Sequence, residues 1–338
     1  MSNKRLIVLI LSAVLLAFVP LVVESPYYMH LLIMSGINAI LAMTFVLMLR
    51  TGLISLAIAG FLGIGSYAST LLVMRLKLSF WLALPASAII TGILALGVGF
   101  LLVKNAGFSF LILTAVVGML IVEVFGNIKL LGGYQGIESI PPPDPIPIPF
   151  FPPIEFASKV PFYYFMLFLL LLVVIAFSAF FRAWTGRAWM AIGLNPRLAE
   201  SLGINVFRYR LLAFVVGSAT AGLIGSFYAH YIESILPGSF GIFKTIHVHI
   251  YAILGGVGSA VLGPVIGSFI MTFVPELLRI TREIEPILTG LLVIFLILFL
   301  PRGLLSLFGQ EGESSSVWEK MARIGIGIKW SVKSIRDK

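Results

Sequence analysis

The sequence is free of cysteine and poor in charge, and each scarcity excludes a class of protein. Without cysteine, its 338 residues form neither disulfide bonds nor thiolate metal sites. Only 11% of the residues are charged, whereas 59% are hydrophobic and the mean hydropathy is +1.09. No soluble core needs so many apolar runs of about 18 residues or more, so the composition indicates an all-α membrane protein with several spans.

Motifs of common catalytic sites are also missing. The chain has no G-x-x-x-x-G-K-[ST] phosphate loop, no G-x-S-x-G nucleophile motif and no H-E-x-x-H zinc motif. His247 and His249 are two residues apart, which places them on different faces of a helix and argues against a shared metal. We therefore expect no catalytic residue, no cofactor and no metal in this chain.

Ten apolar runs are candidate transmembrane helices, and an even number places both ends of the chain on one side. The first run has a basic start but no small-x-small cleavage site, so it is expected to be a retained span. The run 245–262 is the weakest, because it is short, contains two histidines and ends in glycines; crossing and re-entry both remain open. The ten runs are residues 5–23, 28–49, 52–74, 80–103, 108–126, 162–181, 210–231, 245–262, 263–281 and 286–301.

The centres of these runs carry no Asp, Glu, Lys or Arg. Carriers driven by protons or sodium usually keep such groups for function, although each costs roughly 2.5–3.5 kcal/mol at the middle of the bilayer. Their absence argues against ion coupling and favours energy supplied by a partner.

The distribution of Lys and Arg predicts the orientation. If both ends lie inside, sixteen of the 23 basic residues fall on inner segments and seven on outer ones. We expect a multi-pass protein of the plasma (inner) membrane with both termini cytoplasmic. The net charge of +9 then reflects the orientation of the chain in the membrane and does not indicate nucleic-acid binding. A basic amphipathic tail at 310–338 should lie in the cytoplasm against membrane lipid.

One long polar segment interrupts the transmembrane domain, which is expected to cover residues 1–309. This cytoplasmic loop, 182–209, contains residues that typically begin and end a helix. Asn195 is a typical N-cap, Pro196 fits the first helical position, and Gly203 can end the helix in the left-handed conformation.

Between these caps an apolar face is expected. Leu198, Ala199 and Leu202 recur at helical spacing. A helix of about two turns is not stable alone in water, so this face needs a surface to lie on. From the residues alone, a helix resting on the membrane and a helix docked to a partner both remain open.

The external loop 127–161 is rich in proline. It holds nine of the 18 prolines, and Phe150, Phe151 and Phe156 alternate with them. Such a segment is expected to be extended and non-helical. It is either a cap over the outer membrane face or a docking surface for an external partner.

Two glycine-rich segments resemble each other. AGFLGIGSYA at 59–68 and AGLIGSFYA at 221–229 fall in runs of the same expected orientation. They record either an internal repeat or similar requirements of close helix packing.

A set of short motifs identifies a family. The motifs are GLISL (52–56), FLGIGSYA (61–68), GRA (186–188), LGINVFRYRLLAFV (202–215), AGLIGSFYAHY (221–231), PGSFG (237–241), LGGVGSAVLGPVIG (254–267) and LPRGLL (300–305). With this order and spacing, the chain from about 30 to 308 resembles the permease subunit of branched-chain amino acid ABC importers, specifically the second, usually longer, permease of the pair. One departure is that the importer loop pattern E-A-A-x-x-x-G, which would begin at Arg197, lacks its Glu and first Ala.

The resemblance implies a fold, a mechanism and partners. The fold would be that of vitamin B12-type (type II) importers with about ten spans. The chain would pair with a second homologous permease, two cytoplasmic ABC ATPases that use ATP, and an external solute-binding protein. The solute would be a branched-chain amino acid, with another small solute such as an amide or a sugar as the near alternative and an ion-coupled carrier as the distant one.

The resemblance also assigns residues. The helix that transmits ATPase movement would comprise Asn195, Pro196, Leu198, Ala199, Leu202 and Gly203. Polar candidates for the translocation path are Ser35, Asn38, Ser66, Tyr67 and Tyr228.

Overall fold

The computed structural model describes residues 18–20, 25–105, 107–147 and 153–277, together with positions 290, 291, 294, 303 and 304. Within these residues the chain is helical, with two isolated β-bridges. Most of the first and last expected spans, and the whole tail 310–338, lie outside them, as do Phe150 and Phe151 of the external loop.

The apolar runs of the sequence become helices of unequal length. The α-helices are α2 (Pro26–Leu49), α3 (Ile58–Met74), α4 (Phe80–Leu102), α5 (Phe108–Asn127), α6 (Lys159–Arg182), α7 (Trp184–Leu194), α8 (Pro196–Ser201), α9 (Val206–Ile232), α10 (Ile242–Gly255) and α11 (Leu262–Leu277). Three short 3-10 helices are η1 (Lys129–Leu131), η2 (Gly133–Gln135) and η3 (Pro237–Phe240). Five of the described helices, α2, α4, α5, α6 and α9, are long and apolar enough to cross a membrane.

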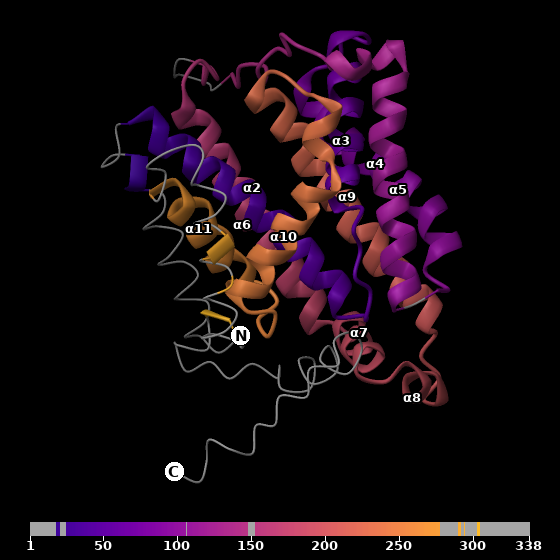
Figure 1. The fold of residues 1–338 in the computed structure, drawn as a ribbon. Helices are drawn as coiled ribbons and strands as arrows, with labels where there is room; N and C mark the ends of the chain where they lie inside the picture. The colour runs from indigo at the N-terminus through magenta and orange to yellow at the C-terminus, as the bar shows by residue number, and fades with distance from the viewer. Residues whose placement is uncertain are drawn as a thin grey trace.

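Helix α2 forms the centre of the bundle. In its most apolar stretch 89% of the residues are buried, against 28% in α4 and 22% in α5. All three helices are apolar all round, so the difference in burial, and not in composition, separates the core helix from those that face lipid. Figure 1 shows α2 running obliquely through the bundle, with α4 and α5 on one flank and α11 on the other.

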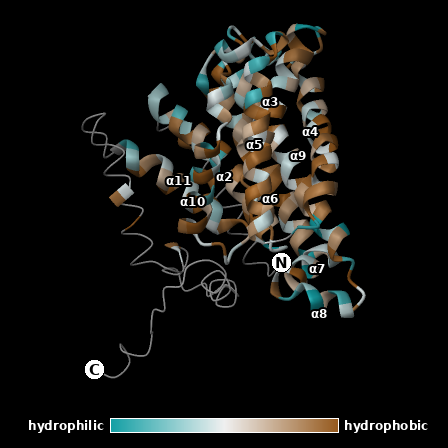
Figure 2. Ribbon diagram, turned by 45° about the vertical axis from the view of Figure 1, so that its right-hand side comes forward, coloured by the Kyte–Doolittle hydropathy of each residue, from teal (hydrophilic) through white to brown (hydrophobic). Residues whose placement is uncertain are grey.

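The connecting segments gather at two opposite ends. One end carries the described part of the proline-rich loop, and the other carries α7 and α8 (Figure 1). We call them the loop end and the α8 end. Arg75 donates to the Leu130 carbonyl at the loop end, and Lys104 lies over the Phe207 ring at the α8 end. The grouping of inner and outer segments in the sequence matches these two ends. Figure 2 shows the polar residues concentrated there and apolar residues along the helices between.

The helix expected over 52–74 begins only at Ile58, so its first part was predicted wrongly. Gly52 adopts a left-handed conformation (φ +78°), and the backbone stays non-helical up to Ala57. Side chains satisfy its amides: Leu56 N donates to Thr114 Oγ1 at 3.0 Å. Non-helical backbone is tolerated inside a membrane protein when it is buried and hydrogen-bonded in this way.

Helices α3 and α9 approach each other through their glycine-rich segments. A Cβ placed on Gly65 would lie 2.1 Å from the Gly222 carbonyl oxygen, and one on Gly225 would lie 2.1 Å from that of Leu62. Such proximity requires that at least one of the two residues in contact has no side chain. The two helices run in the same direction, as expected, and the two similar segments pack against each other.

Helix α10 begins inside the bundle and not at its loop end. The chain leaves the loop end where Ile235 pairs with Ile137, and by Thr245 it has reached the first turn of α3, where Thr245 Oγ1 accepts from Ala59 N at 3.1 Å. Beyond α10, the carbonyl of Gly258 accepts from Arg50 at the α8 end. The segment 235–258 therefore runs from the loop end to the α8 end, whereas 245–262 covers only the second part of that distance.

Candidate functional site

The short helix α8 has both caps that the sequence predicted. The Asn195 side chain accepts a hydrogen bond from Leu198 N at 3.3 Å. At the other end Gly203 has φ +83°; its amide donates to the Glu200 carbonyl and that of Ile204 to the Ala199 carbonyl. This pair of bonds is a Schellman motif, which satisfies carbonyls that the end of a helix leaves free.

The apolar face of α8 is divided between inside and outside. Ala199 is 1% exposed and packs with Ile192 and Val206, whereas Leu198 is 58% and Leu202 72% exposed. Ala199 is thus the residue that holds α8 against α7 and α9. Leu198 and Leu202 remain on the surface and are available for contact with another molecule.

Helices α7 and α8 are firmly attached to the bundle. The indole of the buried Trp189 donates from Nε1 to the Tyr209 carbonyl at 2.9 Å. A Cβ on Gly193 would lie 2.3 Å from the Arg50 carbonyl oxygen, so α7 abuts the end of α2. Helix α7, against which α8 packs, is therefore in direct contact with both α2 and α9.

Two of the path candidates serve helix packing. Ser35 is fully buried and donates to the Leu31 carbonyl of its own helix at 2.7 Å. Ser66 is also fully buried and donates to the carbonyls of Leu62 and Gly225, which ties α3 to α9.

The other three candidates retain polar contacts or polar capacity. Asn38 donates to Thr272 Oγ1 in α11 at 3.3 Å. Tyr67 is 2% exposed, and its hydroxyl has no hydrogen-bond partner among the described residues. Tyr228 lies beneath the ammonium group of Lys244, with Nζ 4.8 Å from the ring centroid. The structure brings Tyr67 and Tyr228 together, because each ring contacts Phe240.

A buried polar chain that the sequence did not single out links α3, α9 and the proline-rich loop. His230 Nε2 lies 3.0 Å from Ser69 Oγ, which in turn accepts from Ser226 Oγ at 2.7 Å. His230 and both serines are fully buried. The only signal in the sequence was a histidine within an apolar helix.

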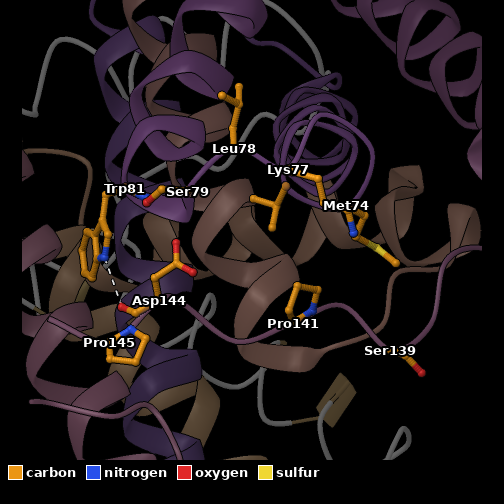
Figure 3. Close-up of a pocket in the computed structure, with 10 residues that line it drawn as sticks. Met74, Lys77, Leu78, Ser79, Trp81, Ser139, Pro141, Asp144 and Pro145 are labelled. Carbon is orange, nitrogen blue, oxygen red and sulfur yellow. Dashed lines mark hydrogen bonds between the residues drawn. The ribbon is translucent and has the colours of Figure 1, made fainter.

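The proline-rich loop and the α3–α4 turn line a shallow, open pocket of about 720 Å³ at the loop end (Figure 3). Asp144 fixes one wall: its carboxylate accepts from Phe80 N at 2.9 Å, and its carbonyl accepts from Trp81 Nε1 at 3.1 Å. Elsewhere in the same loop a hydrogen bond to the Glu123 carboxylate raises the pKa of Tyr134. The described part of the loop lies over the loop end. The prediction that it is wholly non-helical was wrong, because the short 3-10 helices η1 and η2 fall within it.

The structure is thus an apolar helical bundle that carries the short, capped helix α8 at one end. A family model described as the permease component of the branched-chain amino acid transport system matches residues 27–301. The chain belongs to this family. It is thus an integral membrane protein of the class of ABC importer permeases, and the resemblance seen in the sequence is confirmed.

Individual relatives support this assignment. The permease is 26% identical over 288 residues to the high-affinity branched-chain amino acid transport system permease protein LivM of Salmonella typhimurium, an alignment that covers 80% of the chain and 66% of the relative. The chain thus spans slightly less than two thirds of that protein's length. It is 31% identical over 122 residues to LivH of Escherichia coli, 36% of the chain and 39% of the relative. LsrC of Escherichia coli, an autoinducer 2 import system permease protein, is 26% identical over 315 residues, 88% of the chain and 87% of the relative. No solved structure matches the chain.

Proposed function

We propose that this permease translocates branched-chain amino acids by alternating access, driven by ATP hydrolysis on two partner ATPases. A second homologous permease and an external solute-binding protein complete the importer. The transmembrane domain covers residues 1–309 with about ten spans in a type II arrangement, the loop 182–209 and the tail 310–338 face the cytoplasm, and the loop 127–161 faces outward. The similarity to LivM supports the solute, and the similarity to LivH, another permease of the same kind of system, supports the second permease.

One observation carries the coupling role of α8: two leucines stay exposed on a helix that both caps hold in shape. A surface helix with no partner gains nothing from presenting Leu198 and Leu202 to water. A groove in an ATPase would cover both, while Ala199 passes the resulting force to α7 and α9. In this role Asn195, Pro196 and Gly203 keep the helix rigid.

The variant Leu202→Asp tests this assignment. In a docked complex it would bury a carboxylate without a partner, which costs several kcal/mol, comparable to the loss of a hot-spot contact. Residue 202 lies outside the apolar spans, so the variant should reach the membrane in normal amount. We expect at least a tenfold loss of ATPase that copurifies with it and a matching loss of uptake.

Leu202→Met is the matched control, since it keeps the size and polarity of the side chain and should be nearly silent. If Leu202→Asp assembles with the ATPases and supports uptake like the parent, α8 is a surface helix without a coupling role.

A second candidate solute has its own support. The alignment with LsrC covers larger shares of both chains than that with LivM. An importer of a small uncharged, sugar-like solute is the alternative. Uptake of radiolabelled leucine by the reconstituted importer, with and without an excess of unlabelled sugar-like competitor, distinguishes the two: leucine uptake that resists the competitor supports the amino acid.

A further inference from the structure

Lys244 occupies an unusual place for a lysine. It lies in the first turn of α10, the helix that begins inside the bundle beside the first turn of α3. The N-terminus of a helix already carries a partial positive charge, so a cation is disfavoured there, and this first turn contains no acidic residue. The sequence placed Lys244 on an outer segment, whereas the structure places it within the bundle. A cation and a helix N-terminus together create a local positive potential.

The ammonium group of Lys244 has no anionic partner. Among the described residues no carboxylate forms an ion pair with it, and its Nζ lies 4.8 Å from the centre of the Tyr228 ring. Phe240 joins Tyr228 to Tyr67, whose buried hydroxyl also lacks a hydrogen-bond partner within the described chain. The structure therefore holds a lysine and an unused phenol beside one aromatic cluster. Buried polar groups left without partners are rare and commonly mark a function.

The lysine continues into a polar stripe along α10. Lys244, His247 and Tyr251 follow at helical spacing, and the rings of His247 and Tyr251 stack with an interplanar angle of 8°. Lys244 and Tyr251 are half-buried and His247 is exposed. Such a stripe is costly against lipid, so in the membrane it must border a water-filled cavity or other protein. The polar stripe is thus suited to line a route for a polar solute.

We propose that Lys244 binds the carboxylate of the translocated amino acid, with the N-terminus of α10 beside it and the ring of Tyr228 beneath the ammonium group. The inference rests on the proposed function and assigns Lys244 to it as a solute-binding residue. A discontinuous membrane helix that directs its N-terminus at an anionic solute is a recurring solution in transporters. The neighbouring ring of Tyr228, with Phe240 packed behind it, would contact the apolar side chain of a branched-chain amino acid. The chemistry to be recognised is therefore a carboxylate next to an aliphatic group.

The test uses the complete importer in liposomes, with its second permease, ATPases and leucine-loaded binding protein. Leucine uptake and ATP hydrolysis are measured on the same preparation for Lys244→Met, Lys244→Arg and the parent. For Lys244→Met we expect assembly and stimulated ATP hydrolysis to persist while leucine moved per ATP falls roughly tenfold or more, because a charge-assisted hydrogen bond is lost. Lys244→Arg, which keeps the charge, should retain most transport.

Lys104→Met is the matched control. Lys104 also lies over an aromatic ring, that of Phe100 at 5.3 Å, but it is exposed at the α8 end, so its loss should leave transport per ATP unchanged. An equal loss in this control would overturn the proposal, as would parental leucine transport by Lys244→Met.

Failure of Lys244→Met to assemble with the ATPases would assign Lys244 a structural role and would equally overturn the inference. If the parent importer moves no leucine but moves a solute without a carboxylate, the proposed function is wrong. The proposed role of Lys244 in binding a carboxylate is then rejected as well. If the parent moves leucine and only the lysine variants behave unexpectedly, the proposed function stands and this inference alone is rejected.

Discussion

His230 of α9 and Pro141 of the proline-rich loop are 89 residues apart in the chain, yet His230 Nδ1 donates to the Pro141 carbonyl oxygen at 2.7 Å. A carbonyl only accepts, so this contact assigns the proton of the neutral ring to Nδ1. Nε2 must then accept from the hydroxyl of Ser69, which itself accepts from Ser226. Every polar atom in this buried chain has a defined direction, and the chain fastens the loop to α3 and α9.

We predict that His230→Leu destabilises the permease. The substitution leaves the Pro141 carbonyl and the Ser69 hydroxyl without this partner, at about 1–3 kcal/mol for each buried polar group. The apparent Tm of the detergent-solubilised protein should fall by several degrees. Ser226→Ala removes only the terminal donor and should cost less. If His230→Leu and the parent unfold at the same temperature, these hydrogen bonds contribute nothing to stability.

Glycine packing between α3 and α9 gives a second prediction. Gly65→Ala places a methyl group against the backbone of Gly222, which cannot yield without separating the helices, so a loss of about 1–3 kcal/mol is expected. Gly97 in α4 has nothing within 4 Å of an added Cβ, and Gly97→Ala should be neutral or stabilise the helix by up to about 1 kcal/mol. Thermal unfolding in detergent distinguishes them, and a larger loss for Gly97→Ala would contradict this view of the α3–α9 contact.

Orientation is tested with single cysteines, for which the cysteine-free chain is already suited. Asp144→Cys lies at the loop end and Arg197→Cys on α8, at opposite ends of the bundle. In intact cells a membrane-impermeant maleimide should label position 144 and leave 197 unlabelled until the membrane is opened. Ready labelling of 197 from outside would reverse the orientation.

The purified permease alone should hydrolyse no ATP, because its sequence has no phosphate loop. In liposomes it should also move no solute when a proton or sodium gradient is applied, because no Asp or Glu lies at the centre of an expected span. Gradient-driven uptake by this chain alone would favour the ion-coupled carrier over the ABC importer.

Local rules predicted α8 and the long helices well. The caps at Asn195 and Gly203 depend on neighbouring residues alone, and both are confirmed. The late start of α3 could not be predicted in this way, because the non-helical segment before it depends on a hydrogen bond that Leu56 N donates to Thr114, far away in the chain. Lys244 was missed for the same reason: its position inside the bundle follows from the contact of α10 with α3. The contacts of the path candidates could not be predicted from residue type either. Ser35 and Ser66 donate to helix carbonyls, whereas the rings of Tyr67 and Tyr228 pack against Phe240.

Helix α9 is long enough to connect the two ends of the bundle. Its 27 residues form one helix about 40 Å long, which begins beside α8 and ends at the turn that carries His230. A tilt of about 5° at the first end displaces the other by about 3 Å, as much as the length of a hydrogen bond. If the proposed coupling holds and α9 tilts as one rigid body, movement at α8 also moves the proline-rich loop. Under the same condition, a partner bound at the proline-rich loop and a partner bound at α8 change each other's affinity by the same factor.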